Sequence, residues 1–248
     1  DLPNSVIEIG ESAFRECSSL ESIDIPKSLA KIADNAFLNC TSLRSINIPL
    51  SVKHIGENAF RNCSSLENIN VSANNESYSS LDGVLFNKDK TRLIKFPEAK
   101  RINNYTIPSS VREISYFAFE NSQLLKNVVI PYGLDTISAC AFSGCSCLES
   151  IDLSNVQEIE CNAFENCTSL RSVILPKSSV KIKDNAFKGC SSLVSVDLRS
   201  VVGLGNAVFE DCTSLKSLVF PENVVSISEK SFSGCSSLKS IDLGCIKE

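Results

Sequence analysis

The sequence predicts a β-rich solenoid of about 10–11 stacked coils, each of 22–23 residues, with one enlarged coil. Three observations predict this fold. A phenylalanine recurs at a fixed spacing, the same apolar neighbours accompany it each time, and 43% hydrophobic with 21% charged residues suit a folded core. One unit of this length cannot bury its apolar face alone, whereas stacked units bury it in continuous columns.

The recurring phenylalanine, usually preceded by alanine, is the anchor of each repeat. Successive anchors lie 22 or 23 residues apart, except for one gap of 59 residues. That gap equals 23 plus 36, so we expect one enlarged repeat between Phe60 and Phe119 that lacks its anchor. The nine anchors are Phe14, Phe37, Phe60, Phe119, Phe142, Phe164, Phe187, Phe209 and Phe232.

The residues after each anchor predict a strand. A leucine follows six positions later and two more apolar residues follow at nine and eleven, giving L-x-x-I-x-I, the strand core of a leucine-rich repeat. The alternation puts the apolar side chains on one face, and a following proline such as Pro26 or Pro49 ends the strand. An apolar residue five positions before the anchor, such as Ile9 or Ile55, marks a second short extended piece.

These elements combine into one predicted fold. The segment that holds the anchor is expected to be a short helical or 3₁₀ turn that buries its phenylalanine. We therefore predict a leucine-rich-repeat solenoid, α/β horseshoe-like and β-rich, with a parallel β-sheet and one β-hairpin insert. It should form a single solenoid over residues 1–248.

The enlarged repeat, residues 72–105, breaks the rhythm and is a candidate site. Leu81–Phe86 and Thr91–Phe96 are expected to pair as a hairpin around Asn87–Lys90. Insertions on regular scaffolds often carry function. The segment supplies a local basic cluster and two tyrosines, all expected to be exposed: Tyr78, Lys88, Lys90, Arg92, Lys100, Arg101 and Tyr105.

The repeat text "IGxxAFxxCSSLxSIxIPxSV" resembles the BspA-like leucine-rich repeat family over essentially the whole chain. The enlarged repeat is also similar to an insert that recurs in that family. The resemblance implies a non-catalytic, cell-surface or secreted protein that adheres to host matrix proteins, host cells or other microbes. The chain has no Met and begins inside a repeat, so we expect it to be a fragment of a longer chain.

The chain has 12 cysteines, and eight of them follow an anchor by three residues. We expect these eight to stack as small buried residues, because equivalent side chains in adjacent coils run parallel and do not face one another as a disulfide requires. A bridge between Cys140 and Cys161 stays open, and the spacing of the nearby cysteines does not match a zinc module. The eight are Cys17, Cys40, Cys63, Cys145, Cys167, Cys190, Cys212 and Cys235, with Ser122 at the ninth position.

Composition excludes several classes of function. The net charge of −5 argues against nucleic-acid binding, and no apolar run approaches the ~18 residues of a membrane helix. The single histidine, His54, occupies an exposed strand position of the repeat, and no nucleophile elbow is present. The glycines of "VVGLGN" lack the third glycine of a dinucleotide site. We therefore predict no catalytic residues, no metal and no cofactor.

Partners should bind to the outward columns of the sheet. One column is mostly serine, and in the other the apolar residues Val129, Ile174 and Val219 alternate with aspartates, either as contact points or as a relic of a 45-residue duplication. We expect protein partners, such as host matrix or cell-surface proteins. A structural spacer and a carbohydrate binder are the alternatives, although four tyrosines and no tryptophan give a carbohydrate few platforms. The second column comprises Asp24, Asn47, Asn70, Val129, Asp152, Ile174, Asp197, Val219 and Asp242.

Overall fold

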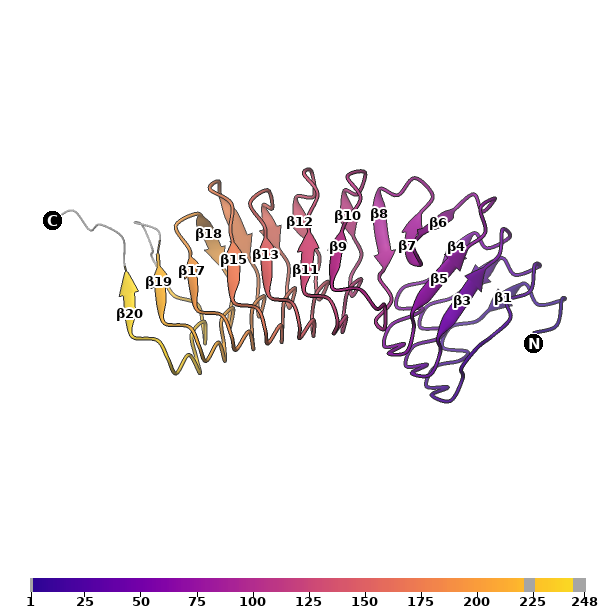
Figure 1. Ribbon diagram of the computed structural model, residues 1–248, viewed down its shortest axis with the longest axis horizontal. Helices are drawn as coiled ribbons and strands as arrows, with labels where there is room; N and C mark the ends of the chain where they lie inside the picture. The colour runs from indigo at the N-terminus through magenta and orange to yellow at the C-terminus, as the bar shows by residue number, and fades with distance from the viewer. Residues whose placement is uncertain (1, 221–225, 243–248) are drawn as a thin grey trace. The chain divides into compact units, whose positions relative to one another are not determined.

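The computed structural model describes residues 2–220 and 226–242, and Asp242 is described in its backbone alone. The chain is a parallel β-solenoid of stacked coils that divides into two compact units (Figure 1). Unit 1 comprises Asp1–Arg101 and Phe117–Ser122, and unit 2 comprises Ile102–Tyr116 and Gln123–Glu248. Each unit is described below by itself.

Unit 1 has two parallel ladders and an antiparallel insert. The first ladder has the order β1-β2-β4 and the second pairs β3 with β5, while β6 and β8 both pair with β7 in antiparallel fashion. The strands are β1 (Glu8–Ile9), β2 (Lys31–Ile32), β3 (Ser45–Ile48), β4 (His54–Ile55), β5 (Asn68–Val71), β6 (Tyr78–Leu81), β7 (Val84–Asn87) and β8 (Arg92–Lys95).

One face of unit 2 is formed by one strand from each successive coil, and we call it the outer face: it comprises β9, β11, β13, β15, β17, β19 and β20. The ladder β9-β11-β13-β15 lies beside a second ladder, β17-β19-β20, and on the opposite side the order is β12-β14-β16-β18 with β10 beside β12 (Figure 1). The strands are β9 (Asn104–Thr106), β10 (Glu113–Ile114), β11 (Asn127–Val129), β12 (Thr136–Ile137), β13 (Ser150–Asp152), β14 (Glu158–Ile159), β15 (Ser172–Ile174), β16 (Val180–Ile182), β17 (Ser195–Asp197), β18 (Val201–Leu204), β19 (Ser217–Val219) and β20 (Ser240–Asp242).

The anchor phenylalanines form stacked columns in the core of each unit, as expected. In unit 1 the ring centroids of Phe14 and Phe37 are 5.3 Å apart with nearly parallel planes. In unit 2 the rings of Phe142, Phe164 and Phe187 follow at steps of 5.2 Å. Most leucines and isoleucines of the repeat pack around these columns and are buried. The expected burial of the apolar face by stacking is therefore confirmed.

The turn that carries each anchor is not helical in the described residues, so neither the expected helical or 3₁₀ turn nor the α/β horseshoe-like form is confirmed. Two residues with positive φ bracket each of the nine predicted anchors, as Asn35 (φ 56°) and Asn39 (φ 64°) do around Phe37. Asparagine tolerates the left-handed region better than most residues. The turns then present backbone groups to the next coil, and the Phe37 N–H donates to the carbonyl of Ala59 at 2.9 Å.

The enlarged coil does contain an anchor, contrary to expectation. Phe96 follows Phe60 by 36 residues, is fully buried and stacks on Phe119 with ring centroids 5.0 Å apart. Its N–H donates to the carbonyl of Ala118 at 2.8 Å, as in the other coils. Lys95 precedes Phe96 where the repeat normally has alanine, and this difference hid the anchor in the sequence.

The insert forms the expected hairpin and one further strand. β7 and β8 pair around the Asn87–Lys90 turn, but β6 also pairs with β7 through Asp82 and Gly83, both at positive φ. The carbonyl of Gly83 accepts the N–H of Ile69 at 2.9 Å. The insert therefore occupies the outer edge of β5, an edge that would otherwise expose unpaired backbone groups.

Candidate functional site

The strongest candidate site is a column of outward side chains on the outer face of unit 2. Strand pairing places Asp152 opposite Ile174 and Asp197 opposite Val219, and it continues to Asp242. Val129 is 57% exposed and Ile174 is 56% exposed, while Val219 is partly exposed. Apolar and acidic side chains thus alternate from coil to coil. We call this set the alternating column: Val129, Asp152, Ile174, Asp197 and Val219.

Local turn chemistry explains the aspartates of this column. Asp152 Oδ1 accepts the N–H of Ser154 at 2.9 Å, and Asp197 Oδ1 accepts the N–H of Arg199 at 3.1 Å. Both contacts close the chain just after its strand, a common role for aspartate. The residue two positions after Val129 or Ile174 is a proline, which has no N–H for a side chain to accept.

The same chemistry does not explain the apolar members. In unit 1, Asp24 and Asn47 also stand two positions before a proline, yet both are polar and exposed. Asn70 is also exposed, and its Nδ2 donates to Asn47 Oδ1 at 3.1 Å. The fold therefore accepts a polar side chain at this position. The coil therefore does not require Val129 and Ile174 to be apolar, and exposed apolar patches often mark contact surfaces.

The acidic members of the column differ in their electrostatics. The Arg199 guanidinium donates to both carboxylate oxygens of Asp197, with Nε–Oδ1 and Nε–Oδ2 distances of 2.9 and 3.0 Å. The hydrogen bond from the Arg199 side chain lowers the pKa of Asp197 below its ordinary value. Asp152 has no such arginine at the equivalent position, where Ser154 stands. Asp152 is therefore the more available acidic group for a partner.

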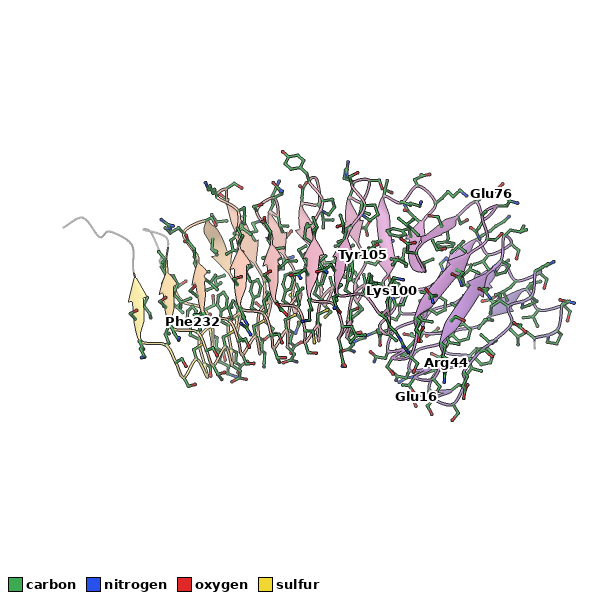
Figure 2. The ribbon with its side chains drawn as sticks, in the orientation of Figure 1. Glu16, Arg44, Glu76, Lys100, Tyr105 and Phe232 are labelled. Atoms are coloured by element: carbon green, nitrogen blue, oxygen red, sulfur yellow. The ribbon has the colours of Figure 1, made fainter. Side chains whose placement is uncertain are left out.

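The two tyrosines of the enlarged repeat are partly buried, and the expectation that they are exposed is wrong. The Tyr78 hydroxyl accepts the N–H of Ile55 at 2.8 Å, and burial raises its pKa. Tyr105 lies on β9 with its hydroxyl oxygen buried (Figure 2). Neither ring offers a free platform to a sugar, whereas Tyr132 and Tyr116 are exposed in unit 2.

The basic side chains of the insert mostly serve the fold. Lys88 Nζ donates to the carbonyl of Asn75, and Lys100 Nζ donates to the carbonyl of Asp82, while burial lowers the pKa of Lys100. Arg101 Nη2 lies 3.3 Å from Glu67 Oε1 in an exposed ion pair. Lys88 and Arg92 are exposed and Lys90 is partly buried, all three at the β7–β8 turn. The insert thus presents a smaller basic surface than its composition indicates.

The structure also shows charged groups that the repeat pattern does not predict. Lys95 and Glu98 are buried, with Nζ and Oε1 3.0 Å apart. Arg61 makes a two-pronged contact to Glu120, at 2.7 and 2.8 Å, and its Cζ lies 3.6 Å from the centroid of the Phe117 ring. All five residues belong to unit 1. Aligning Phe96 with the other anchors would have placed Lys95 at a buried position.

The cysteine column is buried as expected, apart from its first and last members. Thiols along the column donate to the carbonyl of an anchor in a preceding coil, as Cys63 Sγ does to Phe37 O at 3.2 Å. Burial raises the pKa of Cys40 to about 11 and that of Cys63 to about 12. These thiols remain protonated at neutral pH and are poor nucleophiles. Cys140 and Cys161 are not bridged in the structure, where the Cys140 N–H donates to the Cys161 carbonyl at 3.0 Å.

The described residues were compared with the requirements of a metal site and of a membrane-spanning helix. Among residues 2–220 and 226–242, no group of three or more His, Cys, Asp or Glu side chains is arranged to hold a metal ion. In the same residues no helix has the length and apolar character needed to cross a bilayer. In unit 1 the charged side chains of Glu16 and Arg44 lie at one edge of the coils and that of Glu76 at the opposite edge (Figure 2).

Comparison with known proteins agrees with this architecture. The family model described as "BspA type Leucine rich repeat region (6 copies)" matches residues 1–100, 92–203 and 141–246. No curated protein matches the chain. A leucine-rich repeat protein from Eubacterium ventriosum is 26% identical, with a TM-score of 0.77 over 95% of this chain and 76% of that one.

Two other solved structures are similar. A leucine-rich cell surface protein from Faecalibacterium prausnitzii is 28% identical, with a TM-score of 0.67 over 97% of this chain and 58% of that one. The pneumococcal vaccine antigen PcpA is 33% identical, with a TM-score of 0.69 over 97% of this chain and 55% of that one. The chain therefore spans little more than half the length of these two proteins.

Proposed function

Because the chain belongs to the family of BspA-type leucine-rich repeat proteins, we propose that it is a non-catalytic recognition module that binds protein partners through the outer face of unit 2. The observation that carries the proposal is the exposure of Val129 and Ile174 at positions where the fold accepts polar residues. We further propose that the module is displayed at a cell surface or secreted and that it mediates adhesion. The cell-surface protein of F. prausnitzii supports this placement.

The outer face suits recognition better than the insert does. The strands present small side chains, such as Ser150 and Ser172, next to the protruding Val129 and Ile174. A partner can thus reach the apolar groups without displacing larger neighbours. In the insert, Lys88 and Lys100 already bind backbone carbonyls.

A binding experiment tests this proposal. We expect V129N/I174N to reduce binding to responsive matrix proteins at least tenfold, with fibronectin and fibrinogen as immobilised probes in biolayer interferometry. Asparagine occupies the same strand position at Asn47 and Asn70, so the variant should fold. Val202→Asn is the matched control, because Val202 is 63% exposed on β18, away from the outer face.

Three outcomes would count against the proposal. Binding that V129N/I174N leaves unchanged would move the site away from the outer face, and Arg101→Glu would then test the insert. Equal losses in V129N/I174N and V202N would indicate a nonspecific apolar effect. No saturable binding to any protein in the panel would favour a structural spacer.

A further inference from the structure

One tyrosine of unit 2 is more exposed than any other large apolar side chain in the described residues. Tyr132 is 84% exposed and lies in the turn between β11 and β12, at the upper edge of unit 2 in Figure 1. The Leu134 N–H donates to the Pro131 carbonyl at 3.3 Å, and Gly133 has a φ of 95°, which glycine adopts at little cost. The turn therefore holds its tyrosine in a defined position at the surface.

The neighbouring coils leave the Tyr132 ring uncovered. Tyr132 stands ten residues before its anchor, and the same position holds Ser109 in the preceding coil and Ser154 in the following one. Both serines are exposed, and their side chains are too short to cover an aromatic ring. Because the fold accepts serine on both sides, the turn does not require a tyrosine. The ring is thus open to a ligand.

A row of planar polar side chains begins beside this turn. Arg112, Asp135 and Gln157 each stand seven residues before the anchor of their coil, and all three are exposed. The Gln157 N–H donates to the Asp135 carbonyl at 2.7 Å, so these two members are in direct contact across adjacent coils. The same position is apolar in most other coils, as at Val180 and Val202. The row is therefore a local feature that the repeat does not require.

Arg112 connects the row to the turn. Its guanidinium packs against Gly133, where a Cβ atom would lie 3.4 Å from Arg112 Nε and 3.5 Å from Cζ. Arg112 Nη1 donates to the carbonyls of Ser109 and Val111 at 2.7 and 2.9 Å, and these contacts hold the guanidinium in place. Within residues 2–220 and 226–242, no acceptor contacts its Nε or Nη2, so these N–H groups are available to a ligand.

From these features we infer that Tyr132, Arg112, Asp135 and Gln157 form a second binding site, for a neutral sugar. One face of a pyranose ring presents mostly C–H groups and packs on the Tyr132 ring, whose apolar body and polar tip suit such a ligand. Sugar hydroxyls both donate and accept hydrogen bonds, and the row offers donors from Arg112, acceptors from Asp135 and both from Gln157. The opposite charges of Arg112 and Asp135 cancel, so the site attracts neither an anion nor a cation strongly. The site is separate from the alternating column and goes beyond the proposed function.

Saturation-transfer NMR with the full chain tests the inference. The probes are three neutral sugars, methyl β-D-galactopyranoside, methyl α-D-mannopyranoside and chitotriose, with methyl β-D-glucuronide and glucosamine as the anionic and cationic controls. We expect at least one neutral sugar to receive saturation, mainly at the C–H protons of one ring face, and to receive several-fold more than either charged control. Absence of transfer to all three neutral sugars would overturn the inference, and so would stronger transfer to a charged control.

Variants then locate the site. Tyr132→Ser, which copies the adjacent coils, should reduce the transfer at least fivefold, and Asp135→Ala should reduce it several-fold. Tyr116→Ser is the matched control and should leave the transfer unchanged, because Tyr116 is 58% exposed but lies outside the β11–β12 turn. Equal losses in Y132S and Y116S, or no loss in Y132S, would overturn the inference. If Y132S loses binding to matrix proteins but no sugar binds, the inference fails and Tyr132 belongs to the protein-binding surface instead.

Discussion

Single residues show which side chains suit the buried positions of the repeat. Ser122 occupies the place of a cysteine in the thiol column and is 1% exposed. None of the described residues hydrogen-bonds to its Oγ. The cysteines at the equivalent position donate to an anchor carbonyl, as Cys167 Sγ does to Phe142 O at 3.1 Å. A hydroxyl is therefore the poorer side chain here, because it is polar and its shorter bond does not reach the acceptor.

This difference gives a prediction in both directions. Ser122→Cys should raise the free energy of unfolding by about 1 kcal/mol, because it removes an unsatisfied buried hydroxyl. Cys167→Ser should lower the free energy of unfolding by about 1–3 kcal/mol, because it introduces a buried hydroxyl. Urea denaturation under reducing conditions measures both. A stabilising C167S, or a destabilising S122C, would show that the column depends on something other than thiol packing.

Residue identity also explains why the turn was predicted incorrectly. A compact "N-A-F-x-N-C" segment resembles one helical turn in length, and its phenylalanine is buried in either conformation. The distinguishing signal is the pair of asparagines two positions before and after the anchor, which favour positive φ. That signal is weak in single coils, because Phe117, Cys140 and Ala207 also adopt positive φ. Stacking on the neighbouring coils overrides local preference there.

Among the elements, the enlarged coil buries an ion pair that the repeat pattern does not predict. Lys95 stands where most other coils have alanine, and Glu98 stands where they have asparagine, aspartate, glutamate or glycine at positive φ. Their side chains are 7% and 2% exposed and pair at 3.0 Å. Burying two charges costs desolvation that their attraction only partly offsets. The pair therefore depends on both partners being present.

A double-mutant comparison tests this dependence. Lys95→Ala alone should lower the free energy of unfolding by about 3–5 kcal/mol, because it leaves a buried carboxylate without its cation. Adding Glu98→Asn, which restores the side chains of the ordinary coil, should recover most of that loss. Lys183→Ala breaks two more exposed pairs, with Glu158 and Glu160, and should cost less than Lys95→Ala, at most about 1 kcal/mol for each pair. Chemical denaturation in which the double variant is no more stable than Lys95→Ala would refute this account.

The elements that the sequence predicts well are those fixed by period. The parallel strands, the stacked phenylalanines and the β7–β8 hairpin follow from spacings of 22–23 residues and from alternation. The prediction of one strand over Leu81–Phe86 does not include β6, although Asp82-Gly83 is a strong hairpin-turn signal. The repeat pattern does not identify the anchor Phe96, because a buried ion pair replaces the usual alanine and asparagine beside it.

At the scale of the whole molecule, stacking assigns stability to the inward side chains and leaves the outward side chains available for recognition. The core columns consist of inward side chains, such as Val128 and Ile151, whereas the adjacent Val129 and Asp152 point outward. Each coil is supported by its neighbours, so outward positions can change without disturbing the core. This separation explains why the sequence identifies the columns but not the ligand. The repeat period constrains the inward residues, whereas the fold leaves the identity of the outward residues open.

The central claim is that partners bind to the outer face of unit 2, and site-specific photo-cross-linking tests it most directly. Ile174→p-benzoylphenylalanine places the probe on the alternating column, and Val202→p-benzoylphenylalanine places it on β18. Each variant is irradiated with a matrix protein that binds the unmodified chain, and the adducts are mapped by mass spectrometry. The account predicts cross-links from position 174 and none from position 202. Cross-links from position 202, with none from position 174, would contradict it.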